Sequence, residues 1–228
     1  MKRVDEIREN LDTVRAKIDA AAAKAGRSTD EITLIAVTKS FPLSDLEILY
    51  SLGVRQFGEN RDQEASSKVE QLPSDINWHF QGQIQSNKLK SITNWAGCIH
   101  SVDQIKYAQI ISEHSSGQPK PIFIQVSLDQ PPESRGGVDP AKLIELANQI
   151  TKLPGVALQG LMAVAPTDSP TESAFANLAK IHGDFLLTFS NAKSLSSGMS
   201  GDYEMAISYG ATHLRIGSSI LGNRDQIA

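Results

Sequence analysis

The feature that most constrains this chain is a regular alternation between two hydrophobic patterns. Short runs rich in apolar and β-branched residues, such as TLIAVTKS (33–40) and PIFIQVSL (121–128), are typical of strands that are buried on both faces. Longer segments in which apolar residues recur every three or four positions, such as AKLIELANQITKL (141–153), are typical of helices that cover a core. We expect strands at 33–40, 56–60, 78–82, 98–103, 121–128, 158–166, 193–200 and 212–219, and helices at 42–53, 61–72, 86–94, 104–116, 141–153, 169–185 and 201–210.

Eight strand segments that alternate with helices predict a parallel sheet covered by helices. A chain of 228 residues has the length of a (β/α)8 barrel, and we expect this α/β fold, a TIM barrel, as one domain over 1–228. The alternative is a doubly wound open sheet, but VTKSFPL after the first strand lacks the glycine fingerprint of dinucleotide-binding sheets. An extra N-terminal helix is also expected, because one helical face collects Val4, Ile7, Leu11, Val14 and Ile18.

Charge and composition narrow the class of partner. The chain has 22 Lys and Arg against 26 Asp and Glu, a net charge of −4, so we expect no nucleic-acid binding, which rests on clustered positive charge. We expect no membrane association, because no apolar run approaches the ~20 residues of a spanning helix and the N-terminus lacks the apolar core of a signal peptide. Cys98 is the single cysteine, which excludes a disulfide within the chain. These observations favour a cytoplasmic protein with a small-molecule partner.

In a (β/α)8 barrel the functional residues lie at the carboxyl ends of the strands. Lys39 follows the apolar run LIAVT at the end of the first strand. A lysine that is partly removed from water has a lowered pKa, and its neutral amine can form a Schiff base with an aldehyde. The alternative interpretation is an ordinary solvated lysine at a strand end.

Two segments near the end of the chain have the composition of a phosphate site. In SSGMSGD (197–202), small residues let backbone N–H groups approach an anion, and Ser200 adds a hydroxyl, although Ser200 could also be a helix cap. In RIGSSILG (215–222), Gly217 and Ser218 come where barrels often bind phosphate after the last strand. Arg215 could bind the phosphate or point into the barrel mouth at a ring.

The remaining polar residues give weaker signals. Asn60 follows Gly58 and Glu59, and is either a polar contact to a ligand or a turn cap. His79, between Trp78 and Phe80, is either a ligand contact or a hydrogen-bonded residue of the core. The histidines show no metal-ligand spacing along the chain, and no G-x-S-x-G elbow for serine catalysis is present.

Closure of a barrel would bring the Lys39 end of the first strand beside the phosphate segments of the last strands. A lysine imine and a phosphate together suit pyridoxal 5′-phosphate. A phosphorylated sugar in a cofactor-free Schiff-base aldolase would suit the same pair of features.

Several segments carry a resemblance to a known family. VTKSFP, FGENRDQEASSK, WHFQGQIQSNK and SSGMSGDYEMAISYGATHLRIGSSILG occur in order over nearly the whole length. With them the chain resembles the pyridoxal phosphate homeostasis proteins (the YggS/PROSC family). The resemblance implies a barrel like the N-terminal domain of alanine racemase, with the cofactor held as an imine on Lys39. It further implies phosphate contacts from Ser200, Gly217 and Ser218, a pyridine-nitrogen contact from Arg215, and a pocket lined by Asn60, His79 and Met199.

The function that we expect is non-enzymatic buffering and delivery of pyridoxal phosphate, which would influence amino-acid and keto-acid pools. Alanine racemases need a second domain and an opposing tyrosine, and we expect that domain to be absent because the chain ends eight residues after Ile220. Apo forms of pyridoxal enzymes would be partners, and the chain would be a monomer or weak dimer. The alternative is a pyridoxal-dependent racemase or lyase acting on a small amino acid, with His79 as the acid or base besides Lys39.

Overall fold

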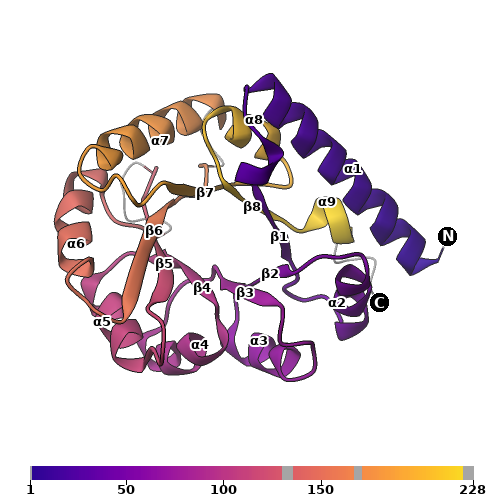
Figure 1. Cartoon of the computed structure of the whole chain (residues 1–228), viewed down its shortest axis with the longest axis horizontal. Coiled ribbons are helices and arrows are strands. Elements are labelled where there is room, and N and C mark those ends of the chain that lie inside the picture. Colours follow the sequence, from indigo (N-terminus) through magenta and orange to yellow (C-terminus); the bar gives the residue numbers. More distant parts are fainter. Residues whose placement is uncertain (1, 130–135, 167–170, 223–228) are drawn as a thin grey trace.

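The computed structural model describes residues 2–129, 136–166 and 171–222. Among these residues, eight parallel strands close into a barrel in chain order, with β1 hydrogen-bonded to β8 (Figure 1). This arrangement confirms the expected (β/α)8 barrel and excludes the open doubly wound sheet. The strands are β1 (Thr33–Val37), β2 (Gln56–Glu59), β3 (Asn77–Phe80), β4 (Cys98–Val102), β5 (Lys120–Gln125), β6 (Val156–Met162), β7 (Ser194–Met199) and β8 (His213–Ile216).

Helices surround the ring of strands on its outside (Figure 1). Each predicted helix is present, although residues 169–170 of the segment predicted at 169–185 lie outside the described part of the chain. Short 3-10 turns at Thr29–Glu31, Ser86–Lys88 and Pro140–Lys142 precede β1, α4 and α6. The helices are α1 (Arg3–Lys24), α2 (Leu43–Ser51), α3 (Asp62–Val69), α4 (Leu89–Trp95), α5 (Ile105–His114), α6 (Leu143–Ile150), α7 (Thr171–Leu186), α8 (Tyr203–Ser208) and α9 (Ser218–Leu221).

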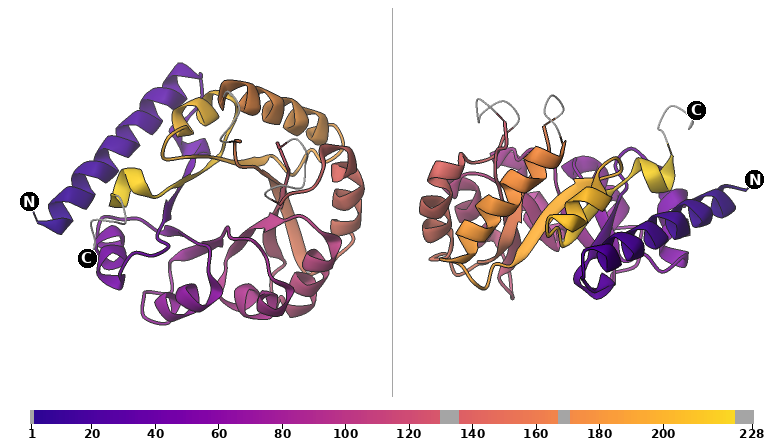
Figure 2. Two further views of the ribbon diagram at one scale, coloured as in Figure 1. Left: turned by 180° about the vertical axis from the view of Figure 1, so that it is seen from behind. Right: turned by 90° about the horizontal axis from the view of Figure 1, so that it is seen from above.

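The extra N-terminal helix α1 covers the barrel where its first and last strands, β1 and β8, meet. Its apolar face is buried through Ile7, Leu11, Val14 and Ile18, as the spacing predicts. This face packs against α8 and α9, which flank the last strand (Figures 1 and 2). Since α9 has only four residues, α1 supplies apolar cover that a full-length eighth helix would otherwise give.

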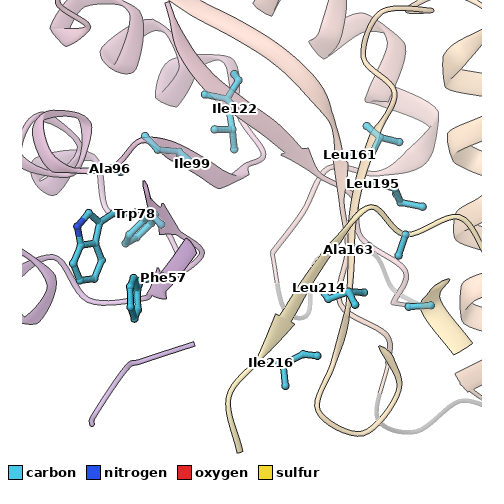
Figure 3. Close-up of a cluster of buried hydrophobic side chains, with 14 of the residues drawn as sticks. Phe57, Trp78, Ala96, Ile99, Ile122, Leu161, Ala163, Leu195, Leu214 and Ile216 are labelled. Atoms are coloured by element: carbon cyan, nitrogen blue, oxygen red, sulfur yellow. The ribbon is translucent and has the colours of Figure 1, made fainter. Parts of the chain in front are cut away.

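The main apolar core lies between the strands and the helices. It includes strand residues such as Phe57, Trp78 and Leu161 (Figure 3) together with helix residues such as Ile92 and Ile111. The inside of the barrel is different, because polar side chains from opposite strands meet there. They include His79, His100, Ser196 and Arg215, each at most 6% exposed.

The chain departs from its predicted elements at the end of β8. The segment predicted as one strand, 212–219, stops at Ile216, and α9 begins at Ser218. The amides of Ile220 and Leu221 donate to the carbonyl of Gly217, which starts this helical turn. Across the described ranges of the chain, we find no helix with the length and hydropathy needed to span a membrane.

Candidate functional site

A cavity of about 710 Å³ opens at the mouth of the barrel, where β1 and β8 meet. The cavity is lined in part by three residues that were not predicted at a site, which are Phe41, Gln81 and Val164. The cavity brings together seven of the eight predicted site residues, which are Lys39, Asn60, Met199, Ser200, Arg215, Gly217 and Ser218.

Lys39 lies in a tight turn directly after β1. Its neighbour Ser40 has a φ of 67°, a left-handed conformation that is unusual for a residue with a side chain. The backbone N–H of Ser40 donates to Glu64 Oε1 of α3 at 2.5 Å, which holds this strained turn in place. The side chain of Lys39 is partly buried at the edge of the cavity.

A second lysine, Lys68, holds the other side of the same turn. Its Nζ donates to the carbonyl oxygen of Thr38 at 2.8 Å, one residue before Lys39. It also pairs with Glu59 Oε1 at 2.8 Å and with Glu64 Oε1 at 2.7 Å. The Glu64–Lys68 spacing of four residues is visible in the sequence, but the contacts with β1 and β2 depend on the tertiary fold.

The pKa values of the two carboxylates beside Lys68 are shifted in opposite directions. Glu59 is fully buried, and burial raises its pKa although the Lys68 ammonium and the Thr38 hydroxyl oppose this shift. Burial acts in the same direction on Glu64, but hydrogen bonds from Lys68 and from the Ser40 N–H outweigh it and lower the pKa. Glu64 therefore supplies the firmly charged partner at the turn.

The loops after β7 and β8 are joined beside the end of β1. Ser200 Oγ accepts the backbone N–H of Gly217 at 3.2 Å and that of Ser219 at 3.3 Å. A Cβ on Gly217 would lie 3.2 Å from the carbonyl oxygen of Val37, so glycine permits this close approach of β8 to β1. Hydroxyls and backbone N–H groups therefore gather where the sequence predicts a phosphate site.

Arg215 forms the floor of the cavity. It is 6% exposed, and its guanidinium donates to Ser196 Oγ at 2.7 Å and to the carbonyl oxygen of Ala163 at 2.9 Å. Burial lowers the pKa of Arg215 to about 10, with Asp202 acting in the opposite direction. The group is thus a fixed cation at neutral pH.

The structure does not bring His79 into this cavity, contrary to the expectation. His79 is 2% exposed inside the barrel, where its Nδ1 lies 2.8 Å from Nε2 of His100. Gln81, two residues further along and on the same face, lines the cavity instead. Burial, with a smaller effect from His213, lowers the pKa of His79 to about 3, so the ring is neutral.

His79, His100 and Cys98 lie together inside the barrel, which the spacing along the chain does not indicate. Their possible ligand atoms lie within 4.8 Å of one another. Burial raises the pKa of the Cys98 thiol to about 12, which opposes the thiolate that a metal ion would need. The facing nitrogens of the two rings already form a hydrogen bond with each other.

Comparison with known proteins shows the family of this chain. The sequence profile of the alanine racemase N-terminal domain matches residues 5–225. The pyridoxal phosphate homeostasis protein of Mycobacterium tuberculosis is 37% identical, over 97% of this chain and 94% of that protein. The chain belongs to the family of pyridoxal phosphate homeostasis proteins. The member from Escherichia coli is 35% identical, over 97% of this chain and 98% of its own length.

Solved structures extend the family comparison. PipY of Synechococcus elongatus, determined with pyridoxal phosphate bound, has a TM-score of 0.83 and 31% identity over 95% of this chain and all of that chain. A protein of unknown function from Bifidobacterium adolescentis has a TM-score of 0.87 and 32% identity, covering 96% of this chain and 95% of that one. Alanine racemase of Clostridium difficile, at 16% identity and a TM-score of 0.75, shares the fold over 95% of this chain and 56% of its own.

Proposed function

We propose that this protein binds pyridoxal 5′-phosphate as an imine on Lys39, and that it buffers and delivers the cofactor rather than catalysing a reaction with it. The observation that carries the proposal is the single cavity that Lys39 shares with Arg215, Ser200, Gly217 and Ser218. The cofactor bound to PipY, a relative at 31% identity, supports the same ligand.

The residues of the cavity fit this cofactor chemically. Its volume of about 710 Å³ lies within the usual range for small-molecule sites. Lys39 offers the amine for an aldehyde, while Ser200 and Ser218 offer hydroxyls for a phosphate. The backbone N–H of Gly217, which donates to Ser200 Oγ in this structure, would turn to the phosphate. Arg215 offers a fixed cation for the ring nitrogen.

When bound, the cofactor supplies an aldehyde and an electron-withdrawing ring. The turn held by Lys68 and Glu64 fixes the Lys39 backbone, so that the amine reaches the cavity from one direction. Arg215 donates but cannot accept a proton, so it leaves a ring nitrogen unprotonated and weakens electron withdrawal. This electrostatic arrangement suits holding the cofactor better than stabilising a carbanion.

The position of His79 also favours a carrier. It is the acid or base that an enzyme was expected to use besides Lys39, and it lies inside the barrel with a lowered pKa. We further propose that apo pyridoxal enzymes receive the cofactor and that the protein is cytoplasmic. The chain would form one binding domain over 1–228 and would be a monomer or weak dimer.

The match to the alanine racemase N-terminal profile favours a second candidate, a racemase or lyase acting on a small amino acid. Incubation of the cofactor-loaded protein with amino acids in heavy water separates the two functions. A carrier leaves Cα unlabelled. Stereospecific deuterium uptake with repeated turnover would establish the enzyme instead.

The visible spectrum of the purified protein tests the carrier proposal. After incubation with excess cofactor and removal of free ligand, the wild type is expected to be yellow. Lys39→Ala should lose the imine absorbance, while Lys90→Ala, at an exposed position on α4, should keep it. A colourless wild type would refute the proposal.

A further inference from the structure

A chain of hydrogen bonds connects Arg215 with the far end of the barrel interior. Ser196 Oγ accepts from Arg215 at 2.7 Å and lies 2.8 Å from Nδ1 of His100. His100 Nε2 lies 2.8 Å from Nδ1 of His79, and His79 Nε2 lies 2.8 Å from Oε1 of Gln56. We call these five residues the interior chain.

The interior chain crosses the barrel rather than following one pair of strands. Arg215 is on β8, Ser196 on β7, His100 on β4, His79 on β3 and Gln56 on β2. Strands β7 and β4 are not neighbours in the ring, so the contact between Ser196 and His100 passes through the interior. Gln56 and His79 do not line the mouth cavity, whereas Arg215 does.

The chemistry of its two ends gives the interior chain one direction. A guanidinium only donates, so Ser196 accepts from Arg215. His79 Nε2 lies 2.8 Å from Gln56 Oε1 and 3.3 Å from Asn77 Nδ2, which itself donates to Gln56 Oε1 at 2.8 Å. Because an amide oxygen only accepts, the shorter contact places a proton on His79 Nε2. A neutral His79 then accepts at Nδ1 from His100, and a neutral His100 accepts at Nδ1 from the Ser196 hydroxyl.

Each hydrogen bond of the interior chain depends on the next one, because the groups are shielded from water. Ser196 and His100 are 0% exposed and His79 is 2% exposed, so a broken link leaves a buried polar atom unpaired. His100 is further fixed by stacking on Phe123, with ring centroids 4.4 Å apart. Such networks rigidify the groups they hold.

We infer that Ser196, His100, His79 and Gln56 are positioning residues that fix the Arg215 guanidinium at the floor of the ligand cavity. The inference rests on the proposed function, since it assigns these residues a role in binding pyridoxal phosphate. It also gives His79 a role through Arg215, two hydrogen-bonded residues away. Residues deep in the barrel thereby control the affinity for a ligand they do not touch.

Two variants test the interior chain at its opposite ends. Ser196→Ala removes the link next to Arg215 and should weaken cofactor binding about tenfold, which corresponds to ~1.4 kcal/mol. Gln56→Leu removes the acceptor at the far end and should weaken binding by a smaller factor, about twofold to threefold. Gln56→Glu keeps the acceptor and should bind as tightly as the wild type. Cys98→Ala is the matched control, because it alters the same interior without removing a link.

A second measurement reports on Arg215 without the cofactor. The exchange rate of its guanidinium protons with water, followed by NMR in the apo protein, should be slow in the wild type and in Cys98→Ala. It should be faster in Ser196→Ala and in Gln56→Leu. A thermal melt of each variant verifies that binding and exchange are measured on folded protein.

The outcomes separate this inference from the proposed function. If the wild type binds the cofactor but Ser196→Ala and Gln56→Leu match Cys98→Ala in affinity and in proton exchange, the interior chain has no positioning role. If the wild type does not bind the cofactor, the proposed function fails, and proton exchange in the apo protein still decides whether the chain fixes Arg215.

Discussion

The ammonium of Lys68 lies 2.8 Å from the carbonyl oxygen of Thr38, the residue that precedes Lys39. Lys68 comes from α3 and Thr38 directly follows β1, so a helix on the outside of the barrel holds the backbone of the proposed imine lysine. The same ammonium pairs with the fully buried Glu59. The position of Lys39 thus depends on a charge that is itself 93% buried.

Replacement of Lys68 should therefore destabilise the fold as well as the site. Lys68→Met leaves Glu59 and the Thr38 carbonyl without their cation, and loss of one partner of a buried pair costs ~3–5 kcal/mol. Urea unfolding measures this cost. Lys106→Met, at an exposed position on α5, is the control and should change the free energy of unfolding by less than ~0.5 kcal/mol. Equal stability of the two variants would contradict the role of Lys68.

Two glycines with nearly the same φ provide a test of packing at the predicted phosphate segment. Gly198 has a φ of 94° and Gly210 a φ of 91°. A Cβ on Gly198 would lie 2.7 Å from Cβ of Ala206, whereas a Cβ on Gly210 would meet nothing within 4 Å. Both alanine variants carry the cost of a left-handed backbone, and Gly198→Ala should lose a further ~1–3 kcal/mol from overpacking. Unfolding free energies that agree within error would show that β7 and α8 separate easily.

Acid should lower the free energy of unfolding of the apo protein, because its buried histidines resist protonation. Burial lowers the pKa of His79 to about 3 and that of His213 to about 4, and lowers that of His100 as well. Histidines of the unfolded chain take up protons near pH 6.5, whereas those of the folded protein do so only at lower pH. The contribution of these histidines to the free energy of unfolding is therefore fully present above about pH 6.5 and is lost as the pH falls towards 4. Each such histidine contributes a slope of ~1.4 kcal/mol per pH unit in that window.

Urea unfolding at several pH values between 7 and 4.5 checks this expectation. Glu59, whose pKa is raised by burial, acts in the opposite direction, so the comparison of variants is more informative than the total slope. His79→Phe should reduce the slope by ~1.4 kcal/mol per pH unit. An unchanged slope would show that His79 is protonated in the folded protein.

The fold was predictable because its signal is local. Apolar runs such as 121–128 and helical faces such as 141–153 report on their own burial, and eight strands that alternate with helices leave few topologies. The grouping of Lys39 with Ser200 and Gly217 was predictable for a related reason, since barrel closure places the ends of β1, β7 and β8 side by side.

The rest depended on the direction and partners of individual side chains. His79 in β3 and Gln81 just after it are two residues apart, and the sequence does not say which of them reaches the mouth. The contact of Lys68 with Thr38 joins residues 30 positions apart, and that of His100 with Ser196 joins residues 96 apart. Hydrophobic periodicity gives no information on such pairs, so both the contacts of Lys68 with the Lys39 turn and the interior chain became visible only in the structure.

The central claim is a covalent bond between Lys39 and the cofactor, and reductive trapping tests it most directly. The protein is incubated with pyridoxal phosphate, reduced with borohydride, digested and mapped by mass spectrometry. We expect the reduced cofactor adduct on the peptide that contains Lys39 and its absence from that position in Lys39→Ala. An adduct spread over exposed lysines, or concentrated on a lysine outside the cavity, would contradict it.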